Sequence, residues 1–406
     1  MDKKIKRFVP VKVYHEITKL NYKNKEHLYI ICDMIIRVGM FRKKEIKGNN
    51  FVEIPKYYFR DIISDSKSLG KAINILKQNK MVICNNYYSK IQGKSLGYKF
   101  PNELISKVKL VYVTKKTLTK KIIKNRNDRN KQITEKLERY KNHFMKTFKI
   151  DFKKALKKLD SDYDYEMERN SNLPLKQQIF KNISTNNKYN YNRLSLQAIA
   201  DGELFFNKNK TNGRVDTNLT SLKGTYKQFI LSENPLYYID IKNSQPFILY
   251  LYLKLKYNHA EIDMYGEWVK NGRFYENFQI KHFNLSGKTM NREQIKNLMF
   301  CIFYSKNTSF LKEKSMFKKV FPKIYEIIKT EKGSKHNQFA IKMQTIESSI
   351  CIDCICQALD IEDINYYTVH DAWIIEKENV ERTMEVINEC FCEKYSTKPT
   401  LDVERV

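Results

Sequence analysis

The N-terminal quarter of the chain alternates apolar clusters with short polar breaks. Apolar side chains recur at helical spacing in three segments, which are 26–41, 54–63 and 66–80. Ser66 or Ser68 is expected to cap the third helix, because serine is a favoured N-cap residue. Residues 81–100 then read as two strands around a glycine-containing turn. The pattern predicts three helices followed by a β-hairpin.

Three helices followed by a hairpin is the order of a winged helix, in which the third helix commonly enters a major groove and the wing contacts phosphate. The lysines of the third helix and of the wing would then bind nucleic acid. They are Lys67, Lys71, Lys77 and Lys80 in the helix and Lys90 and Lys94 in the wing. A winged helix that makes only protein contacts is the alternative. We expect residues 1–103 to form this nucleic-acid-binding domain.

The next region, residues 104–205, is strongly basic. From residue 113 to 160, Lys and Arg are interspersed with leucines and aromatics at helical intervals. A run of charged residues usually forms a solvent-exposed helix face. Here the excess of Lys and Arg over acids is too large for an ordinary solvent-exposed surface. We therefore predict long basic helices that grip a duplex backbone as a reduced thumb. Two polar stretches, 186–193 and 207–213, are predicted to be loops.

In the C-terminal half, two apolar runs each end in an aspartate. The run "LYYI" delivers Asp240 to a strand end, and the chain resumes as an apolar helix after "KNSQP". The segments "YYTV" and "AWII" read as strand, tight turn and strand, with His370 and Asp371 at the tip. Asp371 as a plain turn residue is the alternative, because Asp is favoured in turns. Acids at the ends of buried strands need a cation partner, and two of them would share a pair of Mg²⁺ ions in a phosphoryl displacement.

Between these acids, one helical face repeats a pattern every four residues. Arg292, Lys296, Phe300 and Tyr304 form a slowly drifting stripe on a helix. The stripe spans roughly 18 Å, about the length of a nucleoside triphosphate. The cations near the helix N-terminus would meet phosphates, where the helix dipole also helps, and the aromatics would meet base and sugar. A packed amphipathic helix is the alternative reading.

Composition narrows the class of partner. The 406 residues include 75 Lys and Arg against 45 acids, a formal charge of +30. This surplus favours a polyanionic partner, because counterion release from a phosphate backbone rewards clustered cations. No apolar stretch is long enough to span a bilayer, and the first residues lack the apolar core of a secretory signal. We expect a cytoplasmic protein without a membrane partner, with contact to intracellular lipid as the alternative.

The eight cysteines do not indicate a disulfide scaffold in a chain of this size. "CIDCIC" (Cys351, Cys354, Cys356) and "CFC" (Cys390, Cys392) raise a zinc hypothesis. Both lie in segments with helical periodicity and lack the Gly-rich knuckles that usually present thiolates to zinc. Buried free thiols are therefore favoured over a zinc site.

Five sequence elements occur in a recognisable order. They are "TNGRVDTNLTSL", "YIDIKNSQPF", "REQIKNLMFCIFY", "KMQTIESSI" and "VHD". In this order they resemble the primer-template element, the first palm motif, the fingers helix, the template-facing helix and the second palm motif of the family A polymerases. That family contains bacterial DNA polymerase I and the phage-type single-subunit RNA polymerases. The resemblance covers about residues 210–406, and the tail follows the family's order of hairpin, helix and final strand.

The resemblance implies roles for the matching positions. The metal-binding and catalytic carboxylates are Asp240 and Asp371, for two Mg²⁺ ions that Mn²⁺ would replace. The nucleotide-binding residues are Arg292, Lys296, Phe300, Tyr304 and Gln245, of which Lys296 and Tyr304 also join the catalytic set. The primer-template residues are Arg214, Gln344 and His370.

Two departures from the family concern the ends of its motifs. Ser305 follows Tyr304 where the family usually has Gly, so the turn that ends the fingers helix is expected to differ. Ala372 follows Asp371 where the family often has Glu or Ser, which leaves two carboxylates as the expected core. Glu347 is the candidate for a third.

Sugar selectivity is ambiguous by the same comparison. Gln245 occupies the position at which DNA-polymerising members usually place a Glu that excludes a ribose 2′-OH. Phe300 favours the DNA polymerase pattern, whereas "GRV" and the spacing from Asp240 to Ser244 favour the RNA polymerase pattern. The upstream sequence contains no acidic exonuclease motifs, so proofreading is not expected.

We therefore predict an α+β protein with an N-terminal winged helix, a basic helical thumb-like region and, over residues 206–406, a palm with an antiparallel sheet and helical fingers. The predicted function is template-directed extension of a nucleic-acid 3′ end from nucleoside triphosphates, as a compact DNA polymerase. The domain order suggests replication of a mobile element or phage. An RNA polymerase or primase of the same superfamily is one alternative, and a non-catalytic DNA-binding regulator is another.

Overall fold

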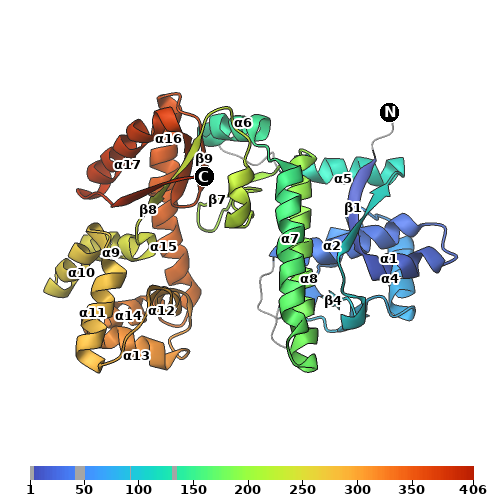
Figure 1. Cartoon of the computed structure of the whole chain (residues 1–406), viewed down its shortest axis with the longest axis horizontal. Coiled ribbons are helices and arrows are strands. Elements are labelled where there is room, and N and C mark those ends of the chain that lie inside the picture. The colour runs from blue at the N-terminus through green and yellow to red at the C-terminus, as the bar shows by residue number, and fades with distance from the viewer. Residues whose placement is uncertain (1–3, 42–50, 92, 130–134) are drawn as a thin grey trace. The chain divides into compact units, whose positions relative to one another are not determined.

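The computed structural model describes residues 4–41, 51–91, 93–129 and 135–406. They form an α+β fold with small antiparallel sheets (Figure 1). The chain divides into two compact units: unit 1 is Met1–Lys131, Lys149–Phe205 and Ser221–Leu231, and unit 2 is Gln132–Phe148, Phe206–Thr220 and Ser232–Val406. Within the described ranges, no helix combines the length and the apolar character needed to cross a membrane.

Unit 1 opens with a strand and two helices. β1 (Ile5–Pro10) pairs antiparallel with β5 (Val108–Val113), so that Ile5 lies opposite Val113. Between them come α1 (Val11–Lys19) and α2 (Lys25–Phe41), and α2 packs against both strands. Because β5 completes this sheet, the N-terminal fold continues past residue 103.

The predicted order of three helices and a hairpin is confirmed. The elements are α2, α3 (Lys56–Arg60), α4 (Ser66–Gln78), β3 (Ile83–Cys84) and β4 (Gly97–Lys99). β4 pairs antiparallel with β3 on one side and with β2 (Val52–Glu53) on the other. The η1 turn (Asn102–Leu104) follows β4. The assignment of these elements as a winged helix stays a prediction.

The N-cap of α4 differs from the predicted one. The cap is Asp65, whose carboxylate accepts hydrogen bonds from the backbone N–H groups of Lys67 at 3.2 Å and Ser68 at 2.9 Å. The hydrogen bonds from Ser68 and Lys67 lower the pKa of Asp65. Ser66 and Ser68 lie inside the helix, because the extended backbone that a cap needs occurs one residue before Ser66.

The basic region contributes the helices α5, α7 and α8 to unit 1. α5 (Lys116–Arg129) follows β5, and α7 (Phe152–Ser171) and α8 (Leu175–Ala200) lie side by side (Figure 1). The η3 turn (Gly224–Phe229) packs on α7. The predicted helices therefore exist, and their grip on a duplex stays a prediction. Residues 130–132 of the predicted basic run lie outside the described residues.

Residues 186–193 were predicted as a loop, and this is wrong because they lie inside α8. Two of them, Tyr189 and Asn190, are buried and donate hydrogen bonds to neighbouring segments. The Tyr189 hydroxyl donates to Asp160 of α7 at 2.7 Å, and the Asn190 amide donates to the Ser106 carbonyl at 2.9 Å. In this part of α8, side-chain hydrogen bonds to neighbouring segments replace the contacts of an apolar stripe. Sequence periodicity detects apolar stripes but does not detect such hydrogen bonds.

Unit 2 contains a four-stranded antiparallel sheet with the order β11-β8-β10-β9. The strands are β8 (Leu236–Ile241), β9 (Tyr366–Val369), β10 (Ala372–Glu376) and β11 (Leu401–Arg405). Ile239, Trp373 and Ile375 are fully buried in the sheet. The η5 turn (Lys377–Asn379) leads into α17 (Val380–Tyr395), which packs on β8 and β10 (Figure 1). The predicted hairpin, helix and final strand are confirmed.

A short helix from the basic region packs on this sheet. α6 (Glu138–Thr147) follows the η2 turn (Glu135–Leu137) and packs against β9. The Tyr140 ring stacks on Tyr366 at 4.7 Å between centroids, and its hydroxyl accepts from the Thr368 N–H at 2.9 Å. Arg139 forms an ion pair with Asp360 at 2.9 Å. Part of residues 104–205 therefore belongs to unit 2.

The remainder of unit 2 is mainly helical. Its helices are α9 (Ser244–Lys256), α10 (Ala260–Lys270), α11 (Phe274–Ser286), α12 (Arg292–Tyr304), α13 (Leu311–Val320), α14 (Pro322–Lys332) and α15 (His336–Ile350). α15 packs against α9, α12 and α14 and continues through η4 (Cys351–Ile355) into α16 (Cys356–Ile361) (Figure 1). α15 thus connects the helical region to the sheet.

A hairpin of β6 (Phe206–Lys208) and β7 (Val215–Thr217) completes unit 2. The predicted loop at 207–213 is therefore partly wrong, because it begins with two residues of β6. All eight cysteines are free thiols. Burial is confirmed for Cys351, Cys356 and Cys390, whereas Cys354 is half-buried and Cys392 exposed.

Candidate active site

The sheet of unit 2 brings the two predicted metal-binding aspartates to neighbouring strands. Asp240 lies in β8 directly opposite Ala372 of β10. Because Ala372 also pairs with Val369, His370 and Asp371 form a two-residue turn between β9 and β10. His370 has a φ of 60°, which is uncommon for a residue other than glycine. Antiparallel register therefore places Asp371 one residue from the partner of Asp240.

A tight strand-to-helix turn follows Asp240. Asn243 has a φ of 55°, in the left-handed region that Asn tolerates better than most residues. Its carbonyl accepts the first helical hydrogen bond of α9, from Phe247 N–H at 2.8 Å. The turn lets one short segment supply both a strand carboxylate, Asp240, and a helix side chain, Gln245.

The charges of both aspartates affect the pKa of two tyrosines, Tyr238 and Tyr275. Burial raises the pKa of Tyr275 to about 12, with Arg292 opposing and Asp240 and Asp371 adding to the shift. Burial also raises the pKa of Tyr238, and the same two carboxylates add to it. Both aspartates therefore contribute negative charge to the surroundings of the same two tyrosines.

Helix α12 carries the predicted stripe on its outer face. A capping box starts the helix: Gln294 N–H donates to the Asn291 side chain at 2.9 Å, and Asn291 N–H donates to the Gln294 side chain at 2.8 Å. The core of the helix consists of Ile295, Leu298, Met299, Ile302 and Phe303. By contrast, Arg292, Lys296 and Phe300 are exposed, and Tyr304 is half-buried. The packed-helix alternative therefore accounts for the opposite face of α12.

The exposed stripe surrounds a tyrosine from α11. The guanidinium of Arg292 lies 5.4 Å from the ring centroid of Tyr275, and the ammonium of Lys296 lies 5.8 Å from it. Further along, the Phe300 and Tyr304 rings lie 5.6 Å apart. The charges of Asp240 and Asp371 also raise the pKa of Tyr275, so this ring experiences the electrostatic fields of both the cations and the aspartates.

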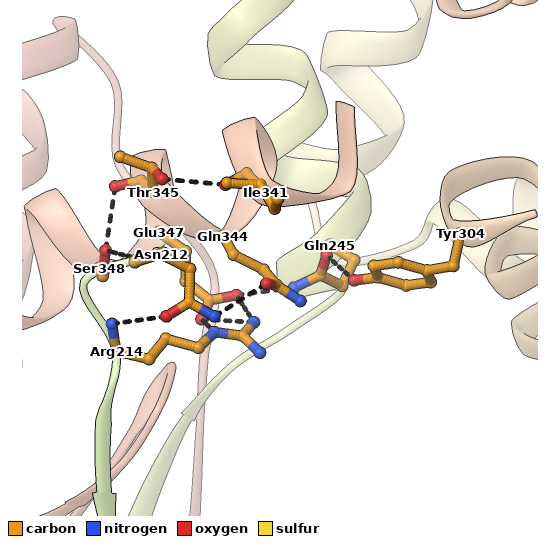
Figure 2. Close-up of polar contacts among 9 residues, drawn as sticks. All are labelled: Asn212, Arg214, Gln245, Tyr304, Ile341, Gln344, Thr345, Glu347 and Ser348. Atoms are coloured by element: carbon orange, nitrogen blue, oxygen red, sulfur yellow. Dashed lines mark hydrogen bonds and ion pairs between the residues drawn. The ribbon is translucent and has the colours of Figure 1, made fainter. Parts of the chain in front are cut away.

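A continuous chain of hydrogen bonds leads from α12 to the β6–β7 hairpin (Figure 2). The Tyr304 hydroxyl donates to Gln245 Oε1 at 2.7 Å, and Gln245 Nε2 donates to Glu347 Oε2 at 2.7 Å. Arg214 then donates to Glu347 through Nε and Nη2, both at 2.7 Å. Four elements, α12, α9, α15 and β7 with its preceding turn, are connected through these side chains.

Glu347 is the most deeply buried member of this chain, with 1% exposure. Burial raises its pKa to about 7; Asp371 raises it further, and Arg214 and Gln245 oppose the shift. The carboxylate therefore points at Arg214 and Gln245 rather than at a metal shared with the aspartates. The hypothesis of Glu347 as a third metal ligand is not supported by these contacts.

The hairpin reaches α15 through a glycine that tolerates no side chain. Gly213 has a φ of +75°, and a Cβ built there would lie 2.5 Å from Ser348 Oγ. That hydroxyl donates to the Asn212 carbonyl at 2.6 Å, and the Asn212 amide donates to Gln344 Oε1 at 3.0 Å (Figure 2). The tight approach fixes Arg214 of the hairpin against α15, the helix that carries Gln344.

Two buried lysines hold the C-terminal end of α12. Lys332 Nζ donates to the Ile302 carbonyl and, at 2.8 Å, to the Ser305 carbonyl. Lys314 Nζ donates to the Lys306 carbonyl. Burial, with Lys314 adding, lowers the pKa of Lys332 to about 8. These ammonium groups satisfy carbonyls at the end of the helix, next to its C-cap residue Ser305.

The aspartates fit a magnesium site. Mg²⁺ is commonly bound by one or two carboxylates together with waters and substrate phosphates. Asp240 and Asp371 supply two carboxylates from paired strands, and their charges reinforce each other at Tyr238 and Tyr275. Within the described part of the chain, no group of three or more His, Cys, Asp or Glu residues is placed to hold a metal.

The predicted DNA-contacting lysines belong to unit 1. Lys67 and Lys71 are exposed on α4, opposite the buried Leu69, Ala72 and Leu76. Lys94 is exposed in the hairpin, with its ammonium 5.2 Å from the ring centroid of Tyr87. Their role in binding nucleic acid stays a prediction.

Sequence reasoning missed three contributors to the site. Tyr275, Lys314 and Lys332 stand in no motif, and their positions depend on how α11, α13 and α14 pack around α12. An isolated lysine in an otherwise apolar helical face is a weak signal for such a buried cap. The role of Glu347 had no sequence signal, because its partners lie 133 and 102 residues away.

Comparisons with known proteins add a likeness to solved structures. No protein-family model matches the chain, and comparison with curated proteins finds no match. Among solved structures, this one is similar to the POL domain of Pol1 from M. smegmatis, which was solved in complex with DNA primer-template and dNTP. The TM-score is 0.48 at 10% sequence identity, and the alignment covers 71% of this chain and 72% of that one.

Proposed function

We propose that this protein is a nucleotidyltransferase that extends a nucleic-acid 3′ end on a template, as a compact DNA polymerase without proofreading. The observation that carries the proposal is the pairing of Ala372 with Asp240, which brings Asp371 beside a second carboxylate. The exposed cations Arg292 and Lys296 lie against Tyr275, whose pKa both aspartates raise. A carboxylate pair together with a cationic helix suits transfer of a phosphoryl group.

In this mechanism Asp240 and Asp371 hold Mg²⁺. When bound, the metal lowers the pKa of a primer 3′-OH and neutralises charge on the triphosphate. The chain's own groups bind and orient the nucleotide. Arg292 and Lys296 lie in the first turns of α12, where the helix dipole also favours the anionic triphosphate. These cations stabilise the negative charge that develops on the leaving pyrophosphate.

The aromatic end of the stripe would meet the base and sugar. Phe300 is 58% exposed, and an exposed phenylalanine on a helix face offers a surface for stacking. Tyr304 is anchored through its hydroxyl to Gln245, which leaves the ring as a wall of the pocket. Closure of α12 over a correct base pair would set fidelity by induced fit.

Arg214, Gln344 and His370 would contact primer and template. Arg214 and Gln344 lie on the two sides of the contact between the β6–β7 turn and α15 (Figure 2). In unit 1, the exposed lysines of α4 and of the hairpin would add electrostatic binding to the phosphate backbone. An RNA polymerase or primase uses the same reacting groups and differs in the sugar that it accepts.

The test is nucleotide incorporation by the purified protein and its Asp371→Asn variant, with Mg²⁺ and primed DNA, and with dNTPs or NTPs in parallel. We expect extension with dNTPs and a loss of at least about a thousandfold in the variant, with DNA binding retained. Glu376→Gln is the matched control, because Glu376 ends the same strand and accepts hydrogen bonds from Ser232 and Asn234, both at 3.0 Å.

Each result has a definite meaning. Extension with NTPs alone would replace the DNA polymerase by an RNA polymerase or primase. Loss of DNA binding together with activity in Asp371→Asn would contradict the role given to Asp371. DNA binding without incorporation from primed DNA or primed RNA would favour the non-catalytic regulator.

A further inference from the structure

The net positive charge of this protein is concentrated in unit 1. This unit contains 44 of the 75 Lys and Arg residues but only 18 of the 45 acids, so 26 of the 30 net charges belong to it. Unit 2, which carries the candidate active site, has 31 Lys and Arg against 27 acids. A polyanionic partner is therefore attracted mainly to unit 1, because attraction over distance follows net charge.

The two basic helices α5 and α7 of unit 1 differ in how their charge is balanced. α7 contains five cations and five acids. Its Lys154 pairs with Asp151 at 3.1 Å, and its Lys158 pairs with Asp162 one turn away. α7 thus has the alternating charges of an ordinary solvent-exposed helix. α5, by contrast, contains six cations and one acid.

Three lysines form a row on the exposed face of α5. Lys116, Lys120 and Lys124 recur every fourth residue and are exposed, whereas Ile122 on the opposite face is buried in the core of unit 1. Like charges four residues apart destabilise a helix, and residues 116–126 include no acid that would offset this repulsion. An anionic partner would relieve the repulsion, because it supplies the missing negative charge.

Side-chain contacts bring α5 beside the start of α4. Lys121 Nζ donates to Ser64 Oγ, and Asn125 Nδ2 donates to the Asp61 carbonyl at 3.3 Å. Ser64 directly precedes Asp65, the N-cap of α4. The Asp65 carboxylate is engaged in the cap, because two backbone N–H groups of α4 donate to it. The middle of α5 therefore lies against the turn that leads into α4.

The first two turns of α4 add exposed lysines of their own, Lys67 and Lys71. We propose that α5 and α4 form one binding surface for the phosphate backbone of duplex DNA, in which Lys120 and Lys124 contact the same duplex as the two lysines of α4. The proposal adds a second helix to the nucleic-acid contacts of unit 1. It rests on the proposed function for its choice of nucleic acid as the partner.

Duplex DNA fits this surface better than a single strand. The row from Lys116 to Lys124 spans roughly 12 Å. Over that length a duplex presents about seven negative charges, at one per about 1.7 Å. Proteins that bind single strands stack the bases on aromatic side chains, and neither α4 nor α5 contains an aromatic residue. The surface offers cations and small polar groups, which suit the outside of a duplex.

The experiment compares two double variants of the full chain that remove the same charge. Lys120→Gln with Lys124→Gln alters the row of α5. Lys154→Gln with Lys158→Gln is the matched control, because it removes two exposed lysines at the same spacing from a helix of the same unit, where both pair with acids. Affinity for a labelled duplex of about 20 base pairs is measured by fluorescence anisotropy between about 50 and 200 mM salt.

We expect the slope of log affinity against log salt to fall by about 2 in the α5 variant, at about 0.9 for each lost phosphate contact. The control should keep the wild-type slope. Lys120→Arg with Lys124→Arg keeps both charges and should also keep the slope. Titration at high protein concentration should give one duplex for each chain, since both helices contact the same duplex.

Several results would overturn this inference. They are an unchanged slope in the α5 variant, an equal fall in the control, two duplexes bound by one chain, and tighter binding of single-stranded DNA than of the duplex. Should the glutamine variant fail to fold in urea unfolding, Lys120→Ala with Lys124→Ala replaces it, because Ala has the highest helix propensity.

The same measurements separate this inference from the proposed function. A wild-type protein that incorporates nucleotides but whose α5 variant keeps its slope overturns the inference alone. A protein that shows the expected fall in slope but incorporates no nucleotide overturns the proposed function alone. Absence of binding to any nucleic acid overturns both.

Discussion

Lys332 offers a quantitative test of how the end of α12 is held. Its side chain is 2% exposed, and its ammonium donates to the Ile302 and Ser305 carbonyls. Burial and the nearby Lys314 lower its pKa to about 8, from an ordinary value of 10.5. The perturbation is Lys332→Met, which keeps an unbranched side chain of similar length and removes the titrating group.

The sign of the effect follows from proton counting. Below about pH 8, Lys332 is protonated in both the folded and the unfolded chain, so the folded protein bears the full free-energy cost of burying its charge. As the pH rises through 8, the folded protein releases this proton before the unfolded chain does. The free energy of unfolding therefore increases with pH. Linkage gives an increase of about 2 kcal/mol from this group between about pH 7 and pH 9.5.

The assay is urea unfolding of the wild-type and variant proteins at both pH values, followed by tryptophan fluorescence. Trp268 and Trp373 both lie in unit 2, so the signal reports the unit that contains Lys332. We expect the wild-type unfolding free energy to gain about 2 kcal/mol more than that of the variant. Lys329→Met, on an exposed position of the same helix, should behave as wild type. Parallel pH dependence of wild type and Lys332→Met would refute the reasoning.

Two further predictions concern the β6–β7 turn and unit 1. Gly213→Ala should lower the unfolding free energy by about 2 kcal/mol, because the φ of Gly213 is +75° and the new Cβ would meet Ser348. Gly224→Ala is the control, because a Cβ at Gly224 meets no atom within 4 Å. Equal urea midpoints for the two variants would contradict this prediction. Removing Lys67 and Lys71 together should reduce the slope of log affinity against log salt for duplex DNA by about 2 in fluorescence anisotropy. An unchanged slope, matching the control Lys19→Ala, would indicate that α4 contacts no phosphate.

Much of the geometry of the candidate site could be predicted from the sequence, because it depends on the pattern of apolar and polar residues within short segments. The apolar run before Asp240 and the two runs around His370 and Asp371 determine strands and a tight turn. The four-residue repeat from Arg292 to Tyr304 determines one face of a helix. Strand alternation and helical periodicity are properties of consecutive residues, so the exposed stripe of α12 and the turn at Asp371 follow directly.

Predictions failed where a polar residue was buried with a distant partner. Residues 186–193 look solvated, yet Tyr189 and Asn190 are paired across to Asp160 and Ser106 inside a helix. The cap of α4 was misplaced by one residue, because several nearby side chains suit a cap and backbone conformation selects among them.

The sequence by itself determined which residues carry charge, the order of the motifs, and the helices and strands in which the motifs around Asp240, Asp371 and Arg292 lie. Only the tertiary structure decided that Asp371 lies one residue from the strand partner of Asp240, that Tyr275 lies near two cations, and that Glu347 pairs with Arg214 and Gln245. The physical reason is that the pKa and the hydrogen bonds of a polar group depend on its burial and on its neighbouring groups. Those partners come from segments far apart in the chain, which only packing brings together.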